Sequence, residues 1–190
     1  LNNGMGQLVG VGIACAVAGL VVGTLSMADL TGKISSGMFT LAGGSYALTL
    51  LVATAAIILL GMGMPTPAVY ALSAVLAAPA LLALKIELLP AHLFIVYFAS
   101  MSAITPPVAV AAFAAASIAR ANPIAVAFVA CRVGIVAFVL PLVFVSQPGL
   151  LLMGDAATVV TTIGFVLMGA LCLVIAFEGW LFGLVATPLR

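Results

Sequence analysis

Two clusters of helix-breaking residues interrupt long apolar stretches of this chain: Gly61–Pro67 (GMGMPTP) and Ser102–Pro107 (SAITPP). Only 5% of the 190 residues are charged and 66% are hydrophobic, whereas a soluble domain carries roughly a quarter charged residues. This composition predicts an all-α, polytopic helical membrane protein. Both clusters would therefore lie among membrane-embedded helices.

Helix breaks inside a membrane need a physical reason. A backbone group without its hydrogen bond costs several kcal/mol in lipid unless protein or water satisfies it. Broken helices whose ends bind ions or substrates are a frequent reason, and kinks closed by packing and hydroxyl groups are the alternative. Because two matching clusters occur in one chain, we favour a binding site.

The prolines of both clusters remove backbone N–H donors from the preceding turn. Four carbonyls are expected to lose their i→i−4 donors in this way: those of Gly61, Gly63, Ser102 and Ala103. Thr66 and Thr105 each precede a proline, so each is predicted to cap the start of a new half-helix. Free carbonyls attract a small hard cation, and helix N-termini attract an anion.

The apolar runs divide what we treat as a single membrane domain. We expect a spanning helix over 6–27, a re-entrant hairpin over 41–84 with its tip at 61–67, a discontinuous helix over 91–121 broken at 102–107, spanning helices over 124–145 and 157–176, and an interfacial tail over 177–190. Two full spans joined by a tight turn are the alternative for 41–84, but the absence of charge near the tip favours the hairpin. The polar residues from Asp29 to Ser36 predict a connection.

Isolated polar residues inside the apolar sequence have two interpretations each. Arg132 lies within the span predicted over 124–145, where arginine is costly; we expect it to snorkel to the interface, with a functional role as the alternative. His92 lies near Lys85 and Glu87, which favours an interfacial anchor over a proton relay. Three widely spaced cysteines are predicted to pack rather than to bind a metal: Cys15, Cys131 and Cys172.

The sequence lacks the residues that intramembrane enzymes need. An aspartyl protease requires two embedded aspartates, but Asp29 and Asp155 fall in predicted loops, and His92 is the only histidine. There is no basic run to bind nucleic acid. We therefore predict a membrane protein that is not an enzyme and has no nucleic-acid partner. Because the chain begins with Leu1, we expect it to be a fragment of a longer protein.

Several segments resemble the large permease subunit of TRAP transporters, and its fused TAXI type in particular. The residues that carry the resemblance are Gly61–Tyr70 (GMGMPTPAVY), Ala91–Phe94 (AHLF), Ala103–Ala109 (AITPPVA), Ala111–Phe113 (AAF), Gly134, Phe138, Pro141 and Pro148–Leu151. One departure is Pro67, where the family more often has a second threonine. Arg132 matches a position where the family often has arginine.

The resemblance implies an elevator-type secondary transporter built from two inverted repeats, and this chain is similar to the second, C-terminal repeat. It also implies coupling to sodium, a periplasmic binding protein as partner, and contacts with the N-terminal repeat, small-subunit-like helices and lipid. Carried over by motif, the sodium-binding residues would be Gly61, Gly63, Ser102, Ala103 and Thr105. The substrate-binding residues would be Met64, Pro65, Thr66 and Pro106.

These expectations combine into one functional hypothesis. The chain would be the C-terminal half of a sodium-coupled importer of small organic anions, such as carboxylates or acidic amino acids, with no cofactor beyond the coupling ion. It would lie in the bacterial inner membrane, and the distribution of Lys and Arg places its C-terminus in the cytoplasm. The alternative is a non-transporting membrane scaffold subunit, in which both breaks are packed shut.

Overall fold

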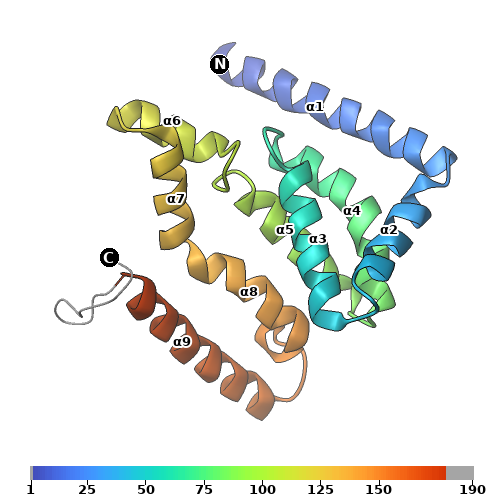
Figure 1. The fold of residues 1–190 in the computed structure, drawn as a ribbon, viewed down its shortest axis with the longest axis vertical. Coiled ribbons are helices and arrows are strands. Elements are labelled where there is room, and N and C mark those ends of the chain that lie inside the picture. The colour runs from blue at the N-terminus through green and yellow to red at the C-terminus, as the bar shows by residue number, and fades with distance from the viewer. Residues whose placement is uncertain (1, 179–190) are drawn as a thin grey trace.

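The computed structural model describes residues 2–178, and these residues form a bundle of helices (Figure 1). No strand occurs within that range, which confirms the predicted all-helical fold. The elements are α1 (Asn2–Met27), α2 (Leu30–Leu41), α3 (Tyr46–Leu60), α4 (Thr66–Ala83), α5 (Leu88–Met101), α6 (Val110–Ala119), α7 (Pro123–Val133), α8 (Ile135–Ser146), the short 3-10 helix η1 (Pro148–Leu151) and α9 (Ala156–Glu178).

Helix lengths agree with a polytopic membrane protein. Three helical stretches are long and apolar enough to cross a membrane on their own, over Leu8–Met27, Thr66–Ala83 and Ala156–Glu178. The apolar helices α3, α5 and α8 have only 12 to 15 residues, which is about 18–22 Å against a hydrocarbon core of about 30 Å. Helices α6 and α7 are apolar as a pair but bend by 117° between them. Broken helices are thus a general feature of this bundle.

Helix α4 lies at the centre of the bundle and packs against α1, α2, α3 and α5. Its sequence is apolar on nearly every face, which is typical of a helix surrounded by others. The main core cluster joins α3, α4, α5 and α8. Within it the rings of Phe94 and Phe98 lie edge to face with centroids 4.8 Å apart, a favoured aromatic geometry. This core places the α3–α4 turn beside the end of α5.

Helix α2 replaces the connection predicted from Asp29 to Ser36. Asp29 takes a left-handed conformation (φ 52°) that separates α1 from α2. Ser35 and Met38 are buried, and α2 contacts α4. The expectation of a loop was wrong because Ser35 and Met38 lie on a helix face that packs against the bundle, while Lys33, Ser36 and Thr40 remain exposed.

The stretch 124–145 is divided at Gly134 into α7 and α8. Arg132, near the end of α7, reaches the last described turn of α9. Its Nε donates a hydrogen bond to the Phe177 carbonyl oxygen at 2.9 Å and lies 3.7 Å from Glu178 Oε1. Arg132 therefore links α7 to α9. Most of the interfacial tail predicted over 177–190 falls on residues 179–190, outside the described part of the chain.

Polar side chains set the starts of two helices. The Asn122 side-chain oxygen accepts hydrogen bonds from the N–H groups of Ile124 and Ala125 at 3.0 and 3.2 Å, and so caps α7. Before α9, the hydroxyl and N–H groups of Thr158 donate to the Asp155 carboxylate and lower the pKa of that carboxyl below its usual value. Both caps mark places where the chain turns between helices.

The Asn122 cap can be tested by substitution. Asn122→Ala should lower the free energy of unfolding by about 1 kcal/mol, because two N–H groups at the start of α7 lose their acceptor. Asn122→Asp keeps an acceptor oxygen and should be close to wild type. Chemical unfolding in detergent micelles measures both variants. Equal losses in Ala and Asp would contradict capping as the cause.

Candidate functional site

The two helix-breaking clusters, 41 residues apart in sequence, meet in the structure. The first forms the turn Gly61–Pro65 between α3 and α4, and the second forms the segment Ser102–Ala109 between α5 and α6. Gly61 is the C-cap of α3, and Ser102 is the C-cap of α5. The C-terminal ends of two apolar helices therefore converge at one point.

The contact between the two ends is close and buried. The Ser102 hydroxyl donates toward two carbonyl oxygens, that of Ala99 at 2.7 Å and that of Gly61 at 3.2 Å. Ser102 is 1% exposed. A Cβ added at Gly61 would overlap Ser102 Oγ and lie 2.5 Å from Ser102 Cβ. Only glycine fits at position 61 while Ser102 keeps its place.

We call the meeting place of Gly61–Pro65 and Ser102–Ala109 the junction. A second contact within the junction lies further along the α3–α4 turn. Gly63 has φ +77°, a left-handed conformation that favours glycine. A Cβ added there would lie 3.6 Å from Val108 Cγ1, so the turn and the broken segment run alongside each other. Met64 packs against the buried core cluster, while Pro65, Thr66 and Pro106 are half-buried.

Three of the four carbonyl oxygens that were expected to be free accept hydrogen bonds from other donors. The Gly61 oxygen accepts from the Met64 N–H at 3.4 Å as well as from Ser102 Oγ, and the Ser102 oxygen accepts from the Thr105 N–H at 3.3 Å. The Ala103 oxygen accepts from the Ala111 N–H at 2.9 Å. The expectation of free carbonyls was wrong at these positions because turns and the next helix supply donors. A carbonyl oxygen has two lone pairs, so a hydrogen bond does not prevent binding of a cation.

The predicted threonine caps are wrong in position. Pro65 is the N-cap of α4 and Thr66 its first residue, with the N–H groups of Ala68 and Val69 donating to the Pro65 oxygen at 3.0 and 3.1 Å. The other break does not restart a helix after Thr105. Helix α6 begins at Val110 instead.

The Thr105 hydroxyl closes the end of α5. Thr105 Oγ1 donates to the Met101 oxygen at 2.7 Å, one turn back along the chain. A nearby carbonyl of the preceding turn is the usual acceptor for a threonine hydroxyl in or beside a helix. Local sequence alone therefore misassigned the direction in which this hydroxyl points.

Helix α7 forms a third wall that the sequence analysis did not assign to the site. Cys131 Sγ lies 3.4 Å from the Ile104 oxygen in the broken segment. A Cβ at Gly134 would lie 3.3 Å from Ile104 Cδ1 and 3.0 Å from the Ala130 oxygen, so glycine permits close approach here. The glycine at position 134, inside an apolar run, was the signal that the sequence offered.

The polar groups of the junction are carbonyl and hydroxyl oxygens, and none of them carries a formal charge. No charged residue occurs in Gly61–Pro65 or Ser102–Ala109, and within residues 2–178 no group of three or more His, Cys, Asp or Glu side chains is placed to hold a metal ion. Two helix C-termini each carry a partial negative charge of roughly half an electron. Their convergence favours a hard cation with oxygen ligands.

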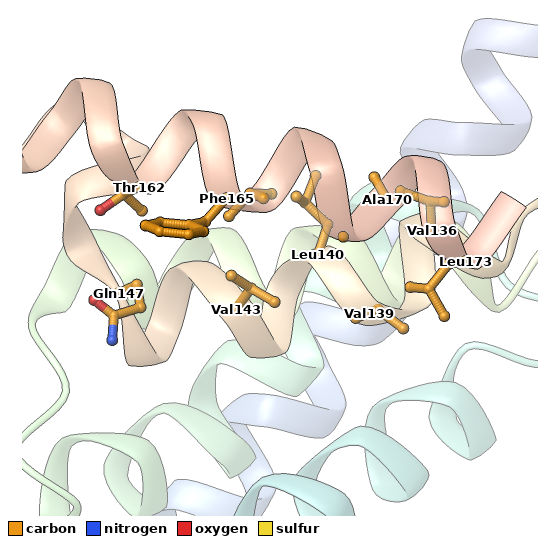
Figure 2. Close-up of a pocket in the computed structure, with 11 residues that line it drawn as sticks. Val136, Val139, Leu140, Val143, Gln147, Thr162, Phe165, Ala170 and Leu173 are labelled. Carbon is orange, nitrogen blue, oxygen red and sulfur yellow. The ribbon is translucent and has the colours of Figure 1, made fainter.

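A separate hollow lies elsewhere in the bundle. It is an apolar groove of about 570 Å³ between α8 and α9 (Figure 2). None of its lining residues belongs to the Gly61–Pro65 turn or to the Ser102–Ala109 segment. The groove and the junction are thus two separate features of the bundle.

The fold and the junction define a polytopic helical membrane protein whose interrupted helices meet inside the bundle. A family model for the DctM component of the tripartite ATP-independent periplasmic transporter matches residues 2–159. The chain belongs to this family, which confirms the resemblance to the large permease of TRAP transporters; the fused TAXI type stays a prediction. No curated protein and no solved structure matches the chain.

The Gly61–Ser102 contact predicts strong coupling between the two positions. Gly61→Ala should lower the free energy of unfolding by about 1–3 kcal/mol, because the new methyl group overpacks against Ser102. Ser102→Gly removes the two Ser102 atoms that the methyl meets and leaves only the Ile57 carbonyl oxygen at 3.2 Å, so the double variant should lose less than the sum of the single variants.

A thermodynamic cycle in detergent micelles measures this coupling. Gly164→Ala in α9 is the matched control, because a Cβ there meets nothing within 4 Å and alanine is the better helix former. Additive losses in the Gly61–Ser102 cycle, within about 0.5 kcal/mol, would contradict direct packing between the two residues.

Proposed function

We propose that this chain supplies a sodium site and one half of a substrate site in a DctM-type permease that imports small organic anions. The observation that carries the proposal is the buried junction between Gly61 and Ser102. Discontinuous helices whose C-terminal ends coordinate sodium, and whose N-terminal ends face anionic substrate groups, are a recurring design of secondary transporters.

The sodium ligands in this proposal are oxygen atoms of the two C-terminal ends. They are the carbonyl or hydroxyl oxygens of Gly61, Gly63, Ser102, Ala103 and Thr105. The hydroxyl protons of Ser102 and Thr105 already point toward carbonyls of the preceding turn, so both hydroxyl oxygens keep lone pairs for a cation. The absence of a carboxylate means that helix dipoles and hydroxyl groups would hold the ion.

The substrate half-site in this proposal lies on the other side of the turn, at the start of α4. Pro67 has no N–H, and the N–H groups of Ala68 and Val69 donate to the Pro65 oxygen. The Thr66 N–H and hydroxyl are then the groups that would meet a carboxylate at this helix N-terminus. Met64, Pro65 and Pro106 would line the site. Because sodium would hold the turn against the broken segment, it would raise affinity for the anion by population shift.

The wider assembly follows from the family. As a DctM component, the chain is part of a tripartite transporter of the membrane. We extend this to delivery of the anion by a periplasmic binding protein, and to a second half-site from an N-terminal repeat of the same permease. We place the chain in the bacterial inner membrane, re-entrant at α3–α4, with its C-terminus in the cytoplasm.

Uptake by the full-length permease in liposomes, with its binding protein, tests sodium coupling. The double variant Ser102→Ala plus Thr105→Ala should raise the sodium concentration needed for half-maximal uptake by about tenfold or more, since each 1.4 kcal/mol of lost ion binding is a factor of about ten.

A matched double variant controls for the loss of helical hydroxyls. Two other serines also donate to carbonyl oxygens of their own helices: the Ser100 hydroxyl to the Val96 oxygen at 2.9 Å, and the Ser117 hydroxyl to the Ala114 oxygen at 2.7 Å. Ser100→Ala plus Ser117→Ala should leave the sodium dependence unchanged. If the Ser102–Thr105 variant folds normally and transports with wild-type sodium dependence, the junction is a packed kink and does not hold the coupling ion.

A further inference from the structure

Helix α5 is bonded to the chain on both sides of the α3–α4 turn. Within residues 2–178, two side-chain hydrogen bonds join α5 and its C-cap to α3, α4 and the turn between them. The first runs from the Ser102 hydroxyl to the Gly61 oxygen, where the turn begins. The second joins the Tyr70 hydroxyl and His92 Nδ1 at 3.0 Å, beyond the point where the turn ends. The turn is therefore attached to one helix at each of its two ends.

The contact between Tyr70 and His92 has the geometry of a specific pair. Their ring centroids lie 6.0 Å apart with an angle of 61° between the ring planes, and both side chains are half-buried. A neutral histidine forms this bond in either tautomer, because Nδ1 accepts from the hydroxyl group when it carries no proton and donates to the phenolic oxygen when it does. Tyr70 also packs against the buried core cluster. The pair thus ties α4 to α5.

Tyr70 lies close to the turn along the chain. Helix α4 begins at Thr66, and Tyr70 is four residues further on, which is about 6 Å of helix rise. Because α4 starts directly after the turn, a shift of its first helical turn would move Gly63 relative to the segment Ser102–Ala109. Apolar packing between α4 and α5 is non-directional, whereas a hydrogen bond favours one distance and one orientation. The Tyr70–His92 bond therefore sets the position of the first turn of α4.

We propose that His92 is a positioning residue of the sodium site and acts on it through Tyr70. This inference rests on the proposed function, in which Gly61 and Gly63 supply sodium ligands from the turn. Ser102 fixes Gly61 directly, while the position of Gly63 depends on α4. Groups that orient the ligands of a metal ion raise its affinity without binding it. An ion that meets a turn already in place also loses less of its binding free energy to ordering the chain.

Thermal unfolding of the purified full-length permease tests this role, with sodium replacing potassium at constant ionic strength. An ion that binds the folded state raises the unfolding temperature, so the dependence on sodium concentration gives its dissociation constant. Tyr70→Phe and His92→Leu each remove the bond and should raise that constant about threefold to tenfold, the factor that corresponds to one net hydrogen bond. The double variant should be no weaker than either single variant, because all three lose the same bond.

Two further variants separate positioning from general stability. His92→Asn keeps a donor and an acceptor on a short side chain, and it should restore wild-type sodium affinity although asparagine is a poorer helix former than leucine. Tyr46→Phe is the matched control. The Tyr46 hydroxyl also joins two helices, because it donates to the Val145 oxygen of α8 at 3.3 Å, but Tyr46 lies at the end of α3 that is remote from the turn. Tyr46→Phe should lower the unfolding temperature in potassium and leave the sodium dissociation constant unchanged.

The outcomes distinguish this inference from the proposed function. A wild-type sodium dissociation constant in Tyr70→Phe and His92→Leu would overturn the positioning role, and so would an equal loss of affinity in Tyr46→Phe. Both results leave the sodium site itself in place, because the wild-type protein still responds to sodium. A wild-type protein that unfolds at the same temperature in sodium and in potassium would contradict the sodium site, and the positioning role with it.

Discussion

The convergence of two helix C-termini at Gly61 and Ser102 is the constraint on which the rest of this structure depends. Peptide dipoles of α3 and α5 point their negative ends at one buried, charge-free place. In such surroundings unpaired carbonyls are costly. The Ser102 hydroxyl, the turn N–H groups and the Ala111 N–H offset part of that cost. A bound cation would offset more of it, which is why the same geometry that stabilises the fold favours an ion site.

The sequence predicted where the helices break, because proline and glycine act locally. It also predicted the membrane class, since almost no charge interrupts the apolar runs. Local patterns could not predict that Gly61 and Ser102 touch, because that contact joins residues distant in sequence through the packing of α4 against α5; only the family resemblance assigned both residues to one site. The prediction of caps at Thr66 and Thr105 was wrong for a related reason. A threonine hydroxyl has several possible hydrogen-bond partners nearby, and the folded geometry determines which of them it contacts.

Helices α7 and α9 are placed differently with respect to this junction. Helix α7 contacts the broken segment through Cys131 and Gly134, so it supports the side of the junction that faces away from the α3–α4 turn. Helix α9 lies outside it, contacts η1 and α8, and is joined to α7 through Arg132. An arginine in an apolar helix here has a structural partner, which explains how the bundle tolerates its charge.

Amide hydrogen exchange of the full-length permease tests the central claim most directly, with sodium and potassium compared at equal ionic strength. If the two C-terminal ends share one ion, sodium will slow exchange in residues 61–65 and 102–109 together, and potassium will not. Exchange in α9 should be the same in both salts. Equal exchange of both segments in the two salts, or protection of one segment alone, would contradict a shared sodium site at Gly61 and Ser102.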